Sequence, residues 1–509
     1  MFILFFCVLL ISLVIGSVIC LDASFILSVN NLLLVDNLWE ILLCLDLTTI
    51  SIYLMLSVCF GYALFYTNHY FMGDPVGVKL NKMIILFVGV MALLTLTSDI
   101  MTTLVFWEYL GVVSFFLILF YSNYLSLRSS VITLVASRFG DVCLFLLIAL
   151  SCYNYYNPIV VCCIFFFIII TKSAGFPFVS WLLEAMRAPT PVSSLVHSST
   201  LVAAGVWFAM RYDMFNFFND CLIIISILLL TIFITGTCCF FFLDLKKIVA
   251  LSTCNNISWC LFYLLCGDVS LSLFQLVSHG VSKCLLFMLV GDVMSGSAGS
   301  QASNCVYAPR LYGNWGLFGL FSIILGLSGA PFIGVFFTKH FLLSNFSSSS
   351  SLLLVVFVYL CVFLSYFYSF RLCSVLSNLY CSSNVGVLFS FNSGLMVYFW
   401  LFINYYIASS LDETTLVGNL SSAMLMLFQL ASCFTAYLFY NSNMLSSWSS
   451  SLFGCDNIVE SVYDLYASVV DAVSLFYFRW DSYTLGVLQG NGVKFINLFN
   501  LYNLNFIMF

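Results

Sequence analysis

Long apolar runs follow one another along almost the whole chain, separated only by short polar stretches. A transmembrane α-helix needs about 20 apolar residues, and these runs have that length. We expect spans near 1–20, 42–66, 80–97, 99–121, 131–152, 159–185 (broken), 191–211, 221–243, 247–266, 270–295, 315–328, 331–346, 351–376, 394–409 and 420–440. The runs are too long and too apolar for barrel strands, and open sheets leave backbone groups unpaired in lipid. The pattern therefore predicts an all-α, polytopic membrane helical bundle.

The end of the chain has a different pattern. A polar, serine-rich segment at 441–452 precedes a stretch in which acids recur among apolar residues at helical spacing. This predicts an amphipathic helix over 455–481, lying along the bilayer surface or on a partner. Its acids favour a protein partner over anionic lipid. The last apolar stretch, 486–509, is expected to be a terminal span.

Composition narrows the function classes. The 509 residues are 63% hydrophobic and only 7% charged, whereas soluble domains carry about 25% charged residues. The net charge of −6 is spread thinly, so nothing indicates nucleic-acid binding. The 21 cysteines lie mostly in apolar runs and lack metal-ligand spacing, and no Gly-rich phosphate loop is present. We expect no metal or cofactor on this chain. Its many residues with T-rich codons indicate an organelle genome.

Lys172 follows one of the most apolar stretches, 159–171. A lysine at membrane depth costs about 2.5–3.5 kcal/mol, so it persists only beside a cavity, a partner or a pathway. Gly175-Phe176-Pro177 comes next, and a proline interrupts a helix. Many transporters build an ion site from a broken helix with an ionisable residue. The alternative, a lysine that snorkels to the interface, is disfavoured by the adjacent break.

Three further charges lie upstream of Lys172. Glu108 has apolar residues on both sides, so it either has a cation nearby or lies near a helix end among headgroups. Arg138 and Asp141 can pair at a spacing of three. That pair is either a structural contact at the membrane boundary or part of a pathway.

Histidine and lysine mark the next segments. Pro191 suits a first helical turn with Thr190 as its cap, and His197 follows in a helix of small hydroxyl residues. A histidine there either shuttles protons or packs. The charged group at 244–247, which contains Lys246, lies either in a solvated loop or inside the bundle.

Gln275, His279 and Lys283 are spaced by four, so they share one face of an apolar helix. This arrangement predicts a polar path through the interior. Lys339 then follows a second Gly/Pro break, at 329–331, whereas Lys172 precedes its own break. The mirrored order is typical of inverted repeats.

Together these segments resemble the antiporter-like membrane subunits of respiratory complex I, the proton-translocating NADH:quinone oxidoreductase, and most of all the largest of them. The resemblance covers about residues 40–375 and rests on 172–177, 181–182, 184–186, 189–193, 244–247, 252–253, 334–339 and 368–371, with Trp107-Glu108, His197, His279 and Lys283. It implies a core with inverted repeats over 80–376, N-terminal spans over 1–66 and additional spans over 394–440. The 455–481 helix would be the lateral helix, lying on an adjacent antiporter-like subunit.

The resemblance also implies roles. Glu108 and Lys172 match the coupled carboxylate and lysine, and Lys339 matches the exit-side lysine. The central relay is matched by His197, Lys246, His279 and Lys283, supported by Arg138, Asp141, Gln275 and His340. The implied setting is the mitochondrial inner membrane, with other membrane-arm subunits as partners and electron transfer left to them.

Two positions depart from the family pattern. Gln275 stands where a second histidine is usual, and an amide cannot take up a proton, so a path there needs water. His340 stands where an acid usually follows the lysine. Three functions remain open: a proton-translocating subunit of complex I, a subunit of a multi-subunit cation/proton antiporter, and a non-conducting scaffold. The retained ionisable residues Glu108, Lys172, Lys283 and Lys339 count against the scaffold, whereas Gln275 and His340 count for it.

Overall fold

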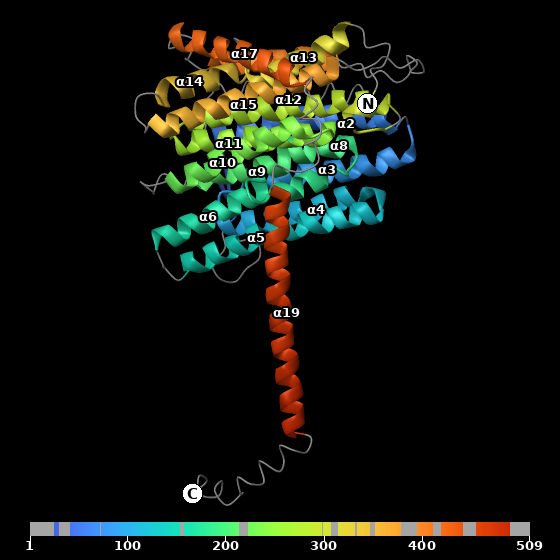
Figure 1. Ribbon diagram of the computed structural model, residues 1–509, viewed down its shortest axis with the longest axis vertical. Coiled ribbons are helices and arrows are strands. Elements are labelled where there is room, and N and C mark those ends of the chain that lie inside the picture. The colour runs from blue at the N-terminus through green and yellow to red at the C-terminus, as the bar shows by residue number, and fades with distance from the viewer. Residues whose placement is uncertain are drawn as a thin grey trace, which may run out of the picture. The chain divides into compact units, whose positions relative to one another are not determined.

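The computed structural model describes residues 25–29, 41–71, 73–152, 157–212, 222–297, 299–306, 314–330, 333–346, 352–377, 394–410, 419–440 and 455–488. The expected span at 1–20 and nearly all of 486–509 lie outside these residues. In the described part, ten helices are long and apolar enough to cross a membrane, with shorter apolar helices among them. The all-α, polytopic architecture is thus confirmed (Figure 1).

The first half of the chain runs from a short strand pair into the bundle. Its elements are β1 (Phe25–Val29), β2 (Ile41–Leu45), α2 (Leu47–Phe71), α3 (Pro75–Leu96), α4 (Ile100–Ile118), η1 (Leu119–Tyr121), α5 (Tyr124–Cys152), α6 (Pro158–Ser173), α7 (Val179–Ala185), α8 (Thr190–Leu195), the π-helical turn η2 (Val196–Thr200) and α9 (Leu201–Tyr212). The second half consists of α10 (Leu222–Phe241), α11 (Leu245–Leu265), α12 (Val269–Ser295), η4 (Ser303–Cys305), α13 (Asn314–Ser328), α14 (Phe336–Phe346), α15 (Leu352–Ser377), α16 (Gly394–Ser410), α17 (Asn419–Tyr440) and α19 (Cys455–Leu488).

The apolar run led us to expect that residues 42–45 belong to the first described span, but they do not. They form strand β2, which pairs antiparallel with β1. The helix starts only after Asp46, because the Thr49 hydroxyl accepts a hydrogen bond from the Asp46 amide at 2.9 Å and donates to its carbonyl oxygen at 2.7 Å. A polar residue with this local bonding ends the strand and begins the helix.

Both expected helix breaks are present. Helix α6 ends at Ser173, with Ala174 in the left-handed region at φ 56°, and α7 resumes at Val179. The second break separates α13 from α14, and Gly329 in it has φ 95°. Positive φ is costly for residues with a Cβ, so glycine suits the second position. The first break leaves Lys172 in the last turn of α6, where helix carbonyls favour a cation.

Burial divides the bundle into a centre and an outer layer. In α12 and in the α8–α9 span, every residue of the most apolar stretch is buried, and α11 is nearly as deep. Helices α4 and α5 lie toward one side of this centre and α13, α14 and α17 toward the other (Figure 1). The central helices can therefore carry polar side chains that lipid-facing helices cannot.

Residues 451–509 form a separate unit, of which helix α19 is described. It runs to Leu488, past the expected end at 481. Its acidic residues Asp464 and Asp471 are exposed, as are large apolar side chains such as Leu465, Phe476 and Trp480. This apolar surface leaves α19 available for a partner.

Candidate proton-transfer site

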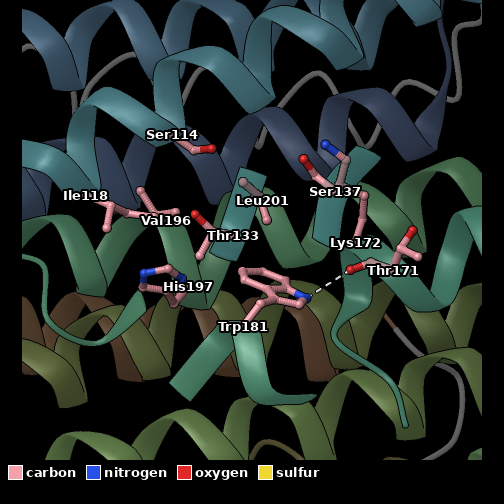
Figure 2. A pocket seen from close by; sticks show the side chains of 10 residues that line it. All are labelled: Ser114, Ile118, Thr133, Ser137, Thr171, Lys172, Trp181, Val196, His197 and Leu201. Atoms are coloured by element: carbon pink, nitrogen blue, oxygen red, sulfur yellow. Dashed lines mark hydrogen bonds between the residues drawn. The ribbon is translucent and has the colours of Figure 1, made fainter. Parts of the chain in front are cut away.

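Lys172 is completely buried at the edge of a small cavity (Figure 2). The cavity volume is about 10 Å³, about the space that one ordered water needs. Hydroxyl groups from three helices line it: Ser114, Thr133, Ser137 and Thr171. His197 lies on its far side from Lys172, next to Trp181, whose indole N–H donates to the Thr171 carbonyl oxygen at 3.0 Å. The cavity thus brings two ionisable groups to one space with the volume of a single water.

Three other charged side chains form a cluster with Lys172. Its Nζ lies 4.0 Å from Asp141 Oδ1 and 5.0 Å from the centre of the Trp107 ring. Arg138 Nη1 pairs with Glu108 Oε2 and lies 3.4 Å from Asp141 Oδ2. The carboxylate in ion-pair range of Lys172 is therefore Asp141, and Glu108 reaches the lysine only through Arg138 and Asp141.

Close backbone packing fixes the position of Lys172. A Cβ on Gly205 of α9 would lie 3.1 Å from both the Ile169 carbonyl oxygen and the Ser173 amide nitrogen of α6. A Cβ on Gly140 of α5 would collide with the Thr171 hydroxyl. Only glycine allows these helices to approach α6 so closely. The last turn of α6 is thereby held between its two neighbours.

His197 belongs to the π-helical turn η2, an element that often occurs at functional sites. Both of its ring nitrogens are buried without a direct hydrogen-bond partner. Lys246, at the start of α11, is also buried, and its Nζ donates to the Ala188 carbonyl oxygen at 3.3 Å. Asp244 and Lys247 pair with each other at 3.4 Å and are partly exposed. Of this charged group, Lys246 lies inside the bundle.

The expected cap at the start of α8 is not formed. The helix begins at Thr190 itself, with Pro189 at the cap position and no side-chain capping bond. The Thr190 hydroxyl instead donates to the Tyr66 hydroxyl at 3.5 Å. The proline at the second position makes a side-chain cap less necessary, because it has no amide hydrogen to satisfy.

Helix α12 carries the second polar group of the interior. Gln275, His279 and Lys283 lie on one face of the helix and are all buried. Lys283 Nζ donates to the Ser252 hydroxyl of α11, and both ring nitrogens of His279 are buried without a direct partner. Gln275 Oε1 accepts a hydrogen bond from the Thr338 hydroxyl of α14 at 2.9 Å. Gln275 thus links α12 to the second broken helix.

Lys339, which follows Thr338, is held by neutral groups. Its Nζ donates to the Ser328 carbonyl oxygen and to the Ser365 hydroxyl, both at 2.6 Å, and lies 4.2 Å from the centre of the Tyr366 ring. No carboxylate of the described residues lies within ion-pair distance of it. His340 is buried against Phe336, with a ring-centroid distance of 6.0 Å.

One buried acid was missed by the sequence reasoning. Asp292, near the end of α12, pairs with His69 of α2 at 3.2 Å. An ionisable residue inside an apolar run is a signal by itself, and Asp292 stands in such a run. Among the residues that the structure places, no group of three or more His, Cys, Asp or Glu side chains has the geometry of a metal site.

The profile of the NADH:quinone oxidoreductase/Mrp antiporter transmembrane family matches residues 97–365. The chain belongs to this family. The matched range contains the charge cluster, the cavity, the polar face of α12 and the second broken helix. The family resemblance expected from the sequence is confirmed.

Three relatives within the family share the name NADH-ubiquinone oxidoreductase chain 5. NADH-ubiquinone oxidoreductase chain 5 of Artemia franciscana is 32% identical over 378 residues, which cover 71% of this chain and 70% of the relative. The protein of that name from Caenorhabditis elegans is 35% identical over 298 residues, covering 57% and 56%. That of Ascaris suum is 33% identical over 382 residues, covering 71% and 66%. The chain therefore spans between about half and 70% of these relatives.

Two solved structures share the fold. The Mrp complex from a Dietzia species superposes with a TM-score of 0.70 at 18% identity, covering 90% of this chain and 56% of that chain. The membrane-bound sulfane sulfur reductase, an archaeal respiratory membrane complex, superposes with a TM-score of 0.68 at 17% identity, covering 85% and 93%. At these identities the likeness concerns the antiporter fold.

Proposed function

We propose that the chain is a proton-translocating membrane-arm subunit of NADH:ubiquinone oxidoreductase in the mitochondrial inner membrane. One observation carries the proposal: buried ionisable groups occur on packed helices from one side of the bundle to the other. They are Asp141, Lys172, His197, Lys246, His279, Lys283 and Lys339, and the partly exposed Glu108 stands at one end of the series. Charges at membrane depth are expensive, so such a series indicates a pathway.

Lys172 would load and release a proton through the cavity. Its 4.0 Å separation from Asp141 is too long for a direct hydrogen bond, and the adjoining cavity has room for a water that bridges polar groups. When the lysine loses its proton, the Asp141 carboxylate keeps only Arg138 as its cation. Arg138 then interacts more strongly with Asp141, and this weakens its pairing with Glu108. A charge change on one side of the cluster is thereby passed to the other.

The centre of the path would need water beside Gln275. An amide cannot take up a proton, but it can orient water. Its Oε1 accepts from Thr338, while its buried Nε2 has no direct partner and would be the donor to such a water. Lys283 and His279 on the same helix face would pass protons toward this point, and Lys339 follows one residue after Thr338.

The outer face of α4 and α5 has features of a surface that another subunit covers. Arg138 is 44% exposed and Glu108 25% exposed, although both lie near the middle of their helices. Large apolar side chains are exposed on the same two helices, including Phe116 and Phe139. A half-exposed arginine at this depth is not stable against lipid. We infer that another membrane subunit covers this face and offers polar groups to the pair.

On this proposal α19 lies along an adjacent antiporter-like subunit, since its exposed apolar side chains need a covering surface. The chain itself would carry no redox cofactor, and electron transfer would occur in other subunits. A cation/proton antiporter subunit is the second candidate, because the fold is shared with the Mrp complex.

Purification of the native assembly tests the proposal. We expect the chain to co-purify with flavin and iron–sulfur subunits that oxidise NADH, and the reconstituted assembly to move protons without sodium. Recovery in an assembly without NADH-oxidising subunits, whose proton movement requires sodium, would contradict the proposal and support the antiporter.

A further inference from the structure

The ion pair of His69 and Asp292 lies near the ends of helices α2 and α12. His69 is in the last turn of α2, directly before the exposed turn at 73–74, and Asp292 is one turn before the end of α12. Their atoms Nε2 and Oδ1 are 3.2 Å apart. The His69 side chain is 21% exposed and that of Asp292 only 2%. A titratable ring that reaches the surface thus contacts a buried carboxylate.

Hydroxyl groups continue inward from this pair. The Tyr66 ring lies one turn from His69, at a centroid distance of 6.1 Å, and its hydroxyl packs against Gly291, the residue before Asp292. The Tyr66 hydroxyl accepts a hydrogen bond from Thr190 at 3.5 Å. Gly291 makes room for this contact, since a Cβ there would collide with the Tyr66 hydroxyl. The sequence of contacts therefore leads from a surface imidazole to the first residue of α8.

The α8 segment leads from Thr190 to the cavity of Lys172. His197 stands seven residues after Thr190, which places both on nearly the same helix face. Between them the helix is rich in buried hydroxyls, Ser193 and Ser194 among them. His197 itself lines the cavity that also contains Lys172. Lys246 lies at the Thr190 end of the segment, where its ammonium donates to the Ala188 carbonyl oxygen.

We propose that His69 and Asp292 form the aqueous proton port for the Lys172 half of the pathway. The inference rests on the proposed function and adds the place where protons pass between water and the hydroxyl series. Protonated His69 gives its Nε2 proton to the Asp292 carboxylate, and the neutral ring takes another from water. The carboxylic acid passes that proton to the Tyr66 hydroxyl, and Tyr66 gives its own proton to the Thr190 hydroxyl once that hydroxyl has rotated from donor to acceptor. The same steps in reverse serve proton release.

The opposing explanation is that the pair only ties α2 to α12. The variant His69→Gln distinguishes a proton port from a structural contact. Its glutamine Nε2 keeps a donor to Asp292 but cannot take up and release a proton. Protons moved per NADH oxidised are measured with the intact, reconstituted assembly, and the ratio counts assembled enzyme only. The wild type and Lys172→Met set the upper and lower limits. Asp46→Asn is the matched control, since it breaks another interhelix ion pair, with Arg211, at the other end of α2.

We expect the number of protons moved per NADH in His69→Gln to fall to that of Lys172→Met. The same ratio in Asp46→Asn should equal that of the wild type. In His69→Ala, added imidazole should restore pumping, whereas pyrazole, a ring of the same size and weaker basicity, should not. If His69→Gln kept the wild-type ratio while Lys172→Met stayed at the lower limit, the pair would serve only to hold α2 against α12. That result would overturn the port but not the pathway. Equal ratios in wild type and Lys172→Met would overturn the proposed pathway together with its port.

Discussion

The contact between Lys172 and Asp141 can be tested by a double-variant cycle. Two unit charges 4.0 Å apart attract each other by about 4 kcal/mol at an effective dielectric constant of about 20. Removing one partner of a buried ion pair costs about 3–5 kcal/mol, because the other charge remains buried. Arg138 still lies 3.4 Å from the second Asp141 oxygen. We therefore expect Lys172→Met to destabilise the folded subunit by the lower figure, about 3 kcal/mol.

The second variant separates stability from proton movement. Lys172→Met/Asp141→Asn leaves no uncompensated carboxylate, so most of the lost stability should return. Neither variant retains a lysine that can load a proton, so both should oxidise NADH with a reduced proton yield. Thermal inactivation of the purified assembly measures the first effect, and dye-monitored acidification of proteoliposomes measures the second.

Two results would refute this reasoning. If the double variant were no more resistant to heat than Lys172→Met, the cost would not arise from the unpaired Asp141. If either variant pumped at the full wild-type yield, Lys172 would not carry protons. Electron transfer serves as the internal control, because NADH oxidation takes place outside this chain on the proposed function.

Two further predictions concern packing and hydrogen bonding. Gly205→Ala places a Cβ 3.1 Å from two backbone atoms of α6, which should cost about 1–3 kcal/mol of stability. The control Gly89→Ala, with no neighbour within 4 Å, should lack this cost. Equal thermal inactivation of the two variants would contradict the close-packing argument. Ser252→Ala deprives the Lys283 ammonium of its acceptor, so the charged form should lose about 1.5–3 kcal/mol and pumping should slow; an unchanged rate in proteoliposomes would show that this bond does not matter.

Sequence reasoning was most successful where chemistry is local. Apolar runs located the described spans, and the prolines at Pro177 and Pro331 marked both broken helices, since a proline interrupts a helix whatever surrounds it. The shared face of Gln275 and Lys283 also followed from spacing alone. The start of α2 was misplaced, because β2 is as apolar as a helix of that length and only hydrogen bonding separates the two.

Contacts between distant segments were beyond reach. Spacing showed that Arg138 could pair with Asp141, but the position of Lys172 against Asp141 depends on how closely α5 and α6 approach. The pair of His69 and Asp292 joins positions that are 223 residues apart, and no periodicity connects them. Such partners depend on how the helices pack, and the residue pattern of a single sequence does not predict that packing.

The depth of α12, α11 and the α8–α9 segment bears on how this gene can change over time. Side chains on the outer helices meet acyl chains, for which one bulky hydrocarbon group serves about as well as another. A nucleotide bias toward thymine can therefore exchange leucine for phenylalanine there at little harm. The three inner segments have less freedom, because polar side chains such as Lys246, Asn255 and Lys283 hydrogen-bond to groups on other segments. Mutational drift should accordingly collect on the bilayer-facing surface and spare the interior.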